Sequence, residues 1–247
     1  MPIPESLVLI GTAFLLAGVI KGVLGFGLPT VTLALLVTTI GLKEAMVLLI
    51  IPCFVTNLWQ TVSGGHFLSL LGRLWTILLG VFVASWLGAV WHATTDPNLL
   101  IGLLGALLCL YAVWGLKMAP IPAPGRHETW LSPLTGVISG ILNGLTGSFV
   151  IPGVMYLQSL DLPRDALIQA MGLLFTVSIV ALGFAFSGNG LLDSEYVGLS
   201  AVAVVPALVG MQIGLGLRHR LNASQFKRTF FGSLLVFGIY FVINPLL

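Results

Sequence analysis

Long apolar runs constrain this chain more than any other feature of its sequence. Charges, prolines and glycines divide it into ten apolar segments, and several approach the about 20 residues that span a bilayer as a helix. Only 7% of the residues are charged and the mean hydropathy is +1.09, whereas about 25% charged residues is usual in soluble domains. So few charges cannot cover a water-facing surface. We therefore expect an all-α integral membrane protein.

The ten segments form two sets of five on either side of a polar linker, KMAPIPAPGRHETW (117–130). The linker's prolines oppose helix formation and suit an exposed connection. We expect six segments to cross a membrane unaided and two, 28–40 and 150–159, to be too short at about 1.5 Å per residue. The segments are 6–24, 28–40, 45–63, 74–91, 98–116, 131–146, 150–159, 166–187, 196–217 and 229–244.

The short segments hold corresponding places in the two sets, which suggests an internal repeat. Without gaps, GVIKGVLG (18–25) aligns with GILNGLTG (140–147), and LKEAM (42–46) with PRDAL (163–167). The matches keep one order along the chain. We therefore predict a first transmembrane repeat at 1–116, a cytoplasmic linker at 117–130 and a second transmembrane repeat at 131–247.

The positive charges predict how the repeats are oriented. If each short segment forms a hairpin with the run before it, each repeat has three full transmembrane helices plus a broken, re-entrant hairpin, and the repeats are inverted. With the linker in the cytosol, Lys43 is then outside and Lys21 within the membrane. The inside residues are Arg73, Lys117, Arg126, Arg164, Arg218, Arg220, Lys227 and Arg228. One broken crossing per pair would instead leave six Lys or Arg outside. The positive-inside rule favours the hairpins, with both termini external to the cytoplasmic membrane.

Glycines and prolines interrupt the apolar sequence at GVIKGVLGFGLP (18–29) and at NGLTGSFVIP (143–152). In hydrocarbon an unpaired backbone group costs several kcal/mol, so irregular chain survives only inside protein or beside a water-filled cavity. Helix N-termini attract anions. Inverted repeats whose broken helices meet near the membrane midplane are typical of secondary transporters.

Lys21 adds a full positive charge beside the first interruption, and no Asp or Glu lies deep in any segment. This arrangement favours an anionic ligand. Two alternatives stay open. The stem of Lys21 can snorkel to the inner interface, or its ammonium can bind backbone carbonyls.

Residues at both interruptions, with polar residues of other segments, are candidates for substrate binding. For each amide or hydroxyl alone, joining two helices is an equally good explanation. The predicted substrate-binding residues are Lys21, Gly22, Gly25, Gly27, Pro29, Thr30, Asn57, Gln60, Asn143, Gly144, Gly147, Ser148, Pro152 and Ser178. We expect Gln169 and Gln212 to join helices.

Nothing in the sequence indicates a metal site, a cofactor or a catalytic centre. Cys53 and Cys109 lack the spacing of zinc ligands. The four histidines, His92 among them, lie at or near loops, so we expect no buried proton relay. An intramembrane enzyme would need a base with a nucleophile or metal at depth, and we predict that the chain is not an enzyme.

The glycine-rich stretches GVLGFGLPTVTLAL and GLTGSFVIPGVMYLQ, with GVFVASWLGAVW and VPALVGMQIGLGLRHRL, carry a family resemblance. In their order along the chain they resemble the TauE/SafE family, the sulfite and organosulfonate permeases also called TSUP. The resemblance covers nearly the whole length. It implies transport of sulfite, sulfonates or related small anions across the cytoplasmic membrane and leaves the direction open.

Two transport functions follow from these observations. A secondary transporter would work by alternating access, driven by a substrate gradient or by a coupling ion, H⁺ or Na⁺, because no GxxxxGK[ST] nucleotide-binding motif is present. An anion channel would use the same electropositive helix ends. In both cases the partners are a small anion and the lipid bilayer, with no nucleic acid expected.

Overall fold

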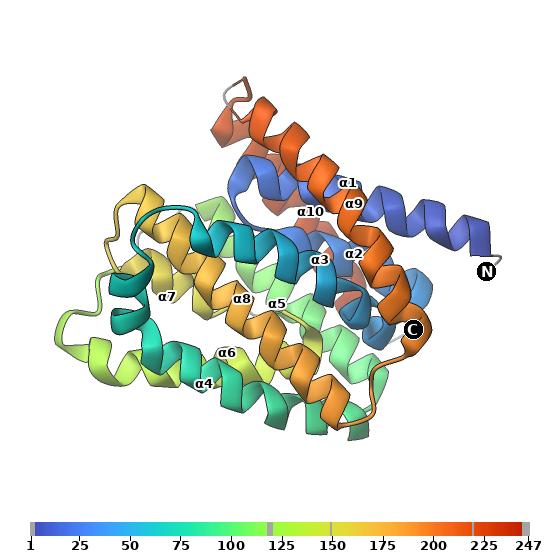
Figure 1. Cartoon of the computed structure of the whole chain (residues 1–247), viewed down its shortest axis with the longest axis horizontal. Helices are drawn as coiled ribbons and strands as arrows, with labels where there is room; N and C mark the ends of the chain where they lie inside the picture. The colour runs from blue at the N-terminus through green and yellow to red at the C-terminus, as the bar shows by residue number, and fades with distance from the viewer. Residues whose placement is uncertain (1–2, 118–120, 149, 219, 244–247) are drawn as a thin grey trace. The chain divides into compact units, whose positions relative to one another are not determined.

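A computed structural model of the chain describes residues 3–117, 121–148, 150–218 and 220–243, and these residues contain helices and connecting segments but no β-strand (Figure 1). The helices are α1 Ile3–Leu24, α2 Leu28–Ile40, α3 Leu42–Val62, α4 Phe67–Thr94, α5 Pro97–Lys117, η1 Gly125–His127, α6 Glu128–Thr146, α7 Gly153–Ser159, α8 Arg164–Gly188, α9 Ser194–Leu217 and α10 Ala223–Ile243. The chain is an all-α integral membrane protein, as its apolar runs predict.

Helix lengths decide which segments can cross a bilayer. Seven of the described helices are long and apolar enough: α1, α3, α4, α5, α8, α9 and α10. The sequence predicts six, and α10 begins at Ala223, earlier than the expected 229, because its polar first turns are helical too. The two segments expected to be short are short, with 13 residues in α2 and 7 in α7.

The polar linker contains more helix than its prolines suggest. Lys117 is the last residue of α5, and Glu128–Trp130 form the first turn of α6 after the 3₁₀ turn Gly125–His127. Proline disfavours helix at and just before its own position, so a helix can begin beyond Pro124. Residues 118–120 of the predicted linker lie outside the described residues, as do the terminal residues 1–2 and 244–247.

The chain divides into two compact units that do not follow the two sequence halves. Unit one comprises Met1–Pro52, Pro97–Met118 and Leu192–Leu247, and unit two comprises Cys53–Asp96 and Ala119–Leu191. The boundary inside α3 falls between Pro52 and Cys53. Each unit thus takes helices from both predicted repeats, and the repeats themselves remain a prediction from the sequence.

In unit one, α1 packs against α9 at a crossing of glycines. A Cβ added to Gly22 would lie 2.8 Å from the Cα of Gly214, and one added to Gly214 would lie 2.9 Å from the Cα of Gly22. A Cβ added to Gly18 would likewise clash with backbone atoms of Ala207 and Met211. Small residues four apart let two helix backbones approach closely where no hydrophobic force drives helices together in lipid. The glycine spacing therefore sets this contact.

In unit two, α6 packs against α4 through an equivalent crossing. A Cβ added to Gly88 would lie 2.9 Å from the Cα of Gly144, and Gly140 meets the backbone of Val81 and Ser85. Gly140 and Gly144 align with the two glycines of α1 in the predicted repeat. In both units, the first helix of one half thus packs against the fourth helix of the other half.

Candidate functional site

The first helix interruption lies at Gly25–Gly27, between α1 and α2. Gly25 and Gly27 have φ angles of 84° and 103°, a region that favours glycine because a Cβ clashes there. The Gly27 carbonyl accepts hydrogen bonds from the backbone N–H of Val31 and from Thr30 Oγ1, both over 3.0 Å. Pro29 stands in the first turn of α2, where its missing N–H is tolerated. The predicted break is confirmed.

Lys21 lies in the last turn of α1, and only 3% of it is exposed. Its carbonyl accepts a hydrogen bond from the N–H of Gly25 over 2.7 Å, which ties the lysine directly to the interruption. Because Lys21 is this deeply buried, its ammonium group is shielded from bulk water. Lys21 therefore sits inside unit one at the point where the helix ends.

Phe26 anchors the interruption in an aromatic cluster that sequence reasoning missed. Its ring centroid lies 6.2 Å from that of Phe230 on α10 and 6.3 Å from that of Tyr111 on α5, both edge-to-face. Tyr111 in turn meets Phe231 at 5.1 Å. Edge-to-face pairs at these distances are favourable beyond the area that they bury. A phenylalanine between two glycines gave no signal of this role, because its partners are remote in sequence.

The second interruption follows α6 in unit two. Gly147 has a φ of 70°, and its N–H donates to the carbonyl of Asn143 over 2.8 Å. The N–H of Ser148 donates to Thr146 Oγ1 over 3.2 Å. After a cis peptide bond before Pro152, α7 begins at Gly153. This predicted break is confirmed as well.

Asn143 joins three helices beside the second interruption. Its Nδ2 donates to Ser85 Oγ on α4 over 3.0 Å and to the carbonyl of Ser178 on α8 over 2.8 Å. All three residues are fully buried. Within the described residues no hydrogen bond reaches Asn143 Oδ1. The structure thus brings together Asn143 and Ser178, two of the predicted residues, and commits the amide donor to contacts within the protein.

Polar side chains also join α3 to α8. Gln60 Nε2 donates to the carbonyl of Ile168 over 2.7 Å, and the hydroxyls of Thr61 and Thr176 lie 2.9 Å apart. Gln169 Nε2 donates to the carbonyl of Thr61 over 2.7 Å, which confirms that Gln169 joins helices. Asn57, one turn before Thr61, is fully buried and accepts at its carbonyl the hydrogen bond of the Thr61 hydroxyl over 2.9 Å.

His92 lies near a loop as expected, but its side chain is buried. It lies in the last turn of α4, yet only 8% of it is exposed. Its Nδ1 is 2.8 Å from the carbonyl oxygen of Leu145, and its ring centroid is 5.4 Å from that of Phe186. The ring is buried because α4 continues to Thr94 against α6. His92 thus fixes the end of α4 to the turn of α6 that precedes the interruption.

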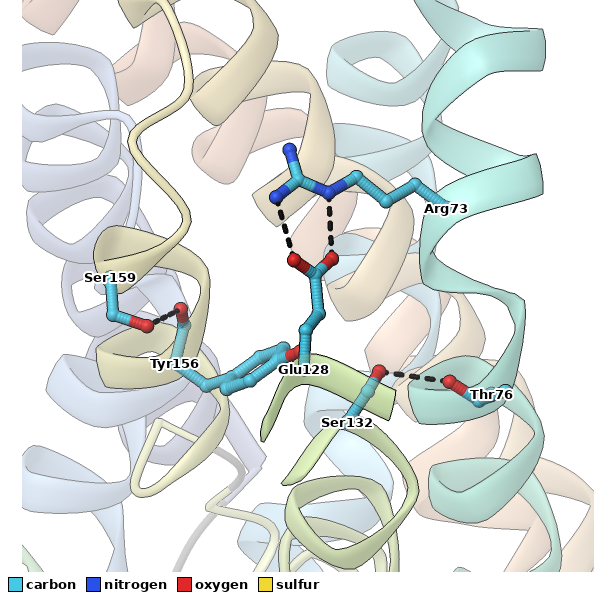
Figure 2. A network of polar contacts seen from close by, with 6 residues as sticks. All are labelled: Arg73, Thr76, Glu128, Ser132, Tyr156 and Ser159. Atoms are coloured by element: carbon cyan, nitrogen blue, oxygen red, sulfur yellow. Dashed lines mark hydrogen bonds and ion pairs between the residues drawn. The ribbon is translucent and has the colours of Figure 1, made fainter. Parts of the chain in front are cut away.

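At the other end of these helices, Arg73 and Glu128 form a bidentate ion pair. Arg73 Nε donates to Glu128 Oε1 over 2.7 Å and Arg73 Nη2 to Oε2 over 2.9 Å, while Thr76 donates to Ser132 over 2.9 Å (Figure 2). Figure 2 shows the ring of Tyr156 from α7 beside Glu128. The hydrogen bond from Arg73 lowers the pKa of Glu128. The pair holds the second turn of α4 against the first turn of α6.

The predicted substrate-binding residues divide between the two units. Lys21, Gly22, Gly25, Gly27, Pro29 and Thr30 belong to unit one. Asn57, Gln60, Asn143, Gly144, Gly147, Ser148, Pro152 and Ser178 belong to unit two. In unit one the residues gather at the first interruption. In unit two, Asn143 beside the second interruption contacts Ser178, whereas Gln60 joins α3 to α8 at Ile168. All of their binding roles remain predictions. Among the described residues, no group of three or more His, Cys, Asp or Glu is arranged to hold a metal ion.

Comparison with known proteins gives two matches that cover most of the chain. The family model described as sulfite exporter TauE/SafE matches residues 10–241. The probable sulfite/organosulfonate exporter TauE of Cupriavidus necator is 25% identical over 230 residues, which cover 92% of this chain and 85% of that protein. No solved structure matches the chain. Because the family model spans nearly the full length, the chain belongs to the sulfite exporter TauE/SafE family.

Proposed function

We propose that the chain is a secondary transporter of sulfite or organosulfonate-type anions in the cytoplasmic membrane. One observation carries this proposal beyond family membership: α1 and α6 each stop at a glycine-containing interruption that is followed by a shorter helix. Interrupted helices at membrane depth are tolerated where they line a cavity, and transporters use their ends to bind substrates.

The chemistry of the first interruption suits an anion. The N-terminus of α2 carries backbone N–H groups without acceptors inside the helix and a partial positive charge. Lys21 lies one turn before the break and brings a full positive charge. Sulfite and sulfonate oxygens accept hydrogen bonds from both kinds of group. We assign anion contact to Lys21, Gly27 and Thr30. Gly25 and Pro29 shape the backbone of the break, and Gly22 holds α1 against α9.

The second interruption takes a supporting part in this proposal. Gly147, Ser148 and Pro152 form the turn, and Asn143 holds it to α4 and α8. Gly144 keeps α6 against α4. Asn57, Gln60 and Ser178 complete the polar surroundings. Alternating access would expose the bound anion to each side of the membrane in turn, driven by a substrate gradient or by coupling to H⁺ or Na⁺.

Counterflow in proteoliposomes tests transport against the alternative of an anion channel. Vesicles loaded with unlabelled sulfite should take up labelled sulfite faster than empty vesicles, because a carrier returns faster when it is loaded. A channel conducts without a binding-site cycle and gives no such acceleration. Parallel assays with taurine, sulfoacetate, thiosulfate and acetate would define the substrate class. Equal rates for loaded and empty vesicles would reject the carrier.

A further inference from the structure

An apolar groove runs along the outside of α10 in unit one. Its volume is about 240 Å³, and its walls come from α1, α2 and α10. The α10 side carries Phe226, Thr229, Phe230, Ser233, Leu234 and Phe237, a spacing of three and four residues that places them on one helix face. Leu16 on the opposite wall is 54% exposed, so the groove opens at the protein surface. An apolar cavity of about 150 Å³ accommodates a benzene molecule, and this groove is larger.

The length of the groove matches one leaflet of a bilayer. Phe226 and Phe237 mark its two ends on α10, and eleven residues of helix rise about 16 Å. The hydrocarbon core of a bilayer is about 30 Å thick, so the groove is as long as half of it. Of its two hydroxyl residues, Thr229 lies in the half nearer Phe226 and Ser233 lies just past the middle, whereas Leu234 and Phe237 form the far end.

Positively charged residues lie at the Phe226 end of the groove. Lys227 follows Phe226 directly and is exposed, and on a helical projection it lies about 20° from Leu234 at the edge of the groove face. Arg218, Arg220 and Arg228 stand within the same segment, 218–228, which contains no Asp or Glu. Basic residues just outside a membrane helix attract anionic lipid headgroups. The basic residues therefore suit the headgroup of an anionic lipid, and the apolar groove suits its acyl chain.

The groove also adjoins the first helix interruption. A Cβ added to Gly27 would lie 3.3 Å from the Phe230 ring and 3.4 Å from Ile20, and both of these side chains line the groove. Phe230 also contacts Phe26 edge-to-face. Whatever occupies the groove thus presses on two of the side chains that support the break.

We propose that this groove binds one acyl chain of an anionic phospholipid whose phosphate contacts Lys227. The proposal depends on the membrane location of the chain and not on the transported substrate. The lipid fills the space between α1, α2 and α10 and steadies the interruption at Gly27 through Ile20 and Phe230.

Native mass spectrometry of the detergent-purified full chain tests the proposal. In titrations with phosphatidylglycerol and phosphatidylcholine of equal chain length, we expect a bound phosphatidylglycerol at concentrations where phosphatidylcholine does not bind. Lys227→Gln should weaken phosphatidylglycerol binding about fivefold, the factor for one juxtamembrane charge. Lys117→Gln is the matched control for charge and should leave binding unchanged. Equal binding of the two lipids, or equal loss in the two variants, would overturn the proposal.

A second pair of variants tests the groove itself. Ser233→Phe fills the groove from its exposed rim and should abolish the bound lipid, whereas Ile239→Phe on another face of α10 should retain it. A phosphatidylglycerol with a photoreactive group on its acyl chain should label peptides containing residues 31–35 and 226–237. Labelling confined to other helices would overturn the assignment. So would a dimer of the chain that Ser233→Phe separates, because the groove would then hold a second copy.

Discussion

The side-chain amide of Asn143 on α6 donates a hydrogen bond to the hydroxyl of Ser85 on α4 over 3.0 Å. The same nitrogen donates to the carbonyl of Ser178 on α8. Three helices of unit two thus meet at one buried amide, one turn before the second interruption. Removing that amide should destabilise the second interruption without changing the glycine of its turn, Gly147.

Asn143→Ala should destabilise the protein by about 1–3 kcal/mol, the range for leaving buried hydrogen-bonding groups unpaired. The apparent unfolding temperature in detergent measures the effect. Asn189→Ala is the matched control, because Asn189 Nδ2 donates to the carbonyl of Ala185 at the end of its own helix. Equal unfolding temperatures for the two variants would show that Asn143 does not join the helices.

The glycine crossings predict opposite effects for chemically identical substitutions. Gly22→Ala and Gly144→Ala place a methyl group against backbone atoms of the neighbouring helix, and overpacking of this kind costs about 1–3 kcal/mol. At Gly11 on α1 and Gly72 on α4, no atom lies within 4 Å of an added Cβ. Gly11→Ala and Gly72→Ala should therefore be neutral or stabilise by up to about 1 kcal/mol. Thermal unfolding of the four variants measures these effects. A change in stability of the same sign in all four variants would contradict the close helix packing at Gly22 and Gly144.

Lys21→Met should reduce sulfite counterflow in proteoliposomes by roughly 10- to 100-fold. A hydrogen bond from a charged group contributes about 1.5–3 kcal/mol, and each 1.4 kcal/mol is about tenfold. Lys43→Met removes a half-buried lysine that pairs with Glu44 over 3.3 Å and should leave counterflow unchanged. Wild-type counterflow in a folded Lys21→Met protein would show that Lys21 does not bind the anion.

The Arg73–Glu128 pair predicts a pH dependence of stability. Because the folded state lowers the pKa of Glu128, this carboxylate contributes stability above its ordinary value of 4.5, and the contribution disappears as the pH falls through the lower folded value. The pair is partly exposed, so we expect about 1 kcal/mol or less. Glu128→Gln should lower the unfolding temperature at neutral pH, and its difference from the wild type should shrink below pH 4.5. A difference independent of pH would contradict the pair.

Cysteine labelling tests the predicted inversion of the repeats. Ser194 begins α9, and Ser224 lies in the first turn of α10. In a protein whose two native cysteines are replaced, Ser224→Cys should react with an impermeant maleimide from the cytoplasmic side only. Ser194→Cys should react from the opposite side only. Reaction of both from one side would reject inverted repeats with external termini.

The positions of helices and breaks could be read from the sequence because the signals for them are local. The run of apolar residues at 28–40 became α2 with those bounds, and the glycines after Leu24 and Thr146 stand where the two helices end. Hydropathy and the steric effects of glycine and proline act within a few residues. No knowledge of the neighbouring helices is needed for such predictions.

The tertiary structure alone decided which helices are neighbours and what each polar residue contacts. Gly22 and Gly144 were predicted as parts of the breaks, yet they lie inside helices as contact points for α9 and α4. Arg73 pairs with Glu128, which is 55 residues away in the sequence. Phe26 contacts Tyr111 and Phe230, which belong to two helices distant in the sequence. These contacts depend on how helix surfaces fit together, since lipid and apolar side chains offer no hydrophobic difference to choose among partners. The shapes of the helix surfaces and the buried hydrogen bonds determine which helices are neighbours, and neither can be read from the order of residues alone.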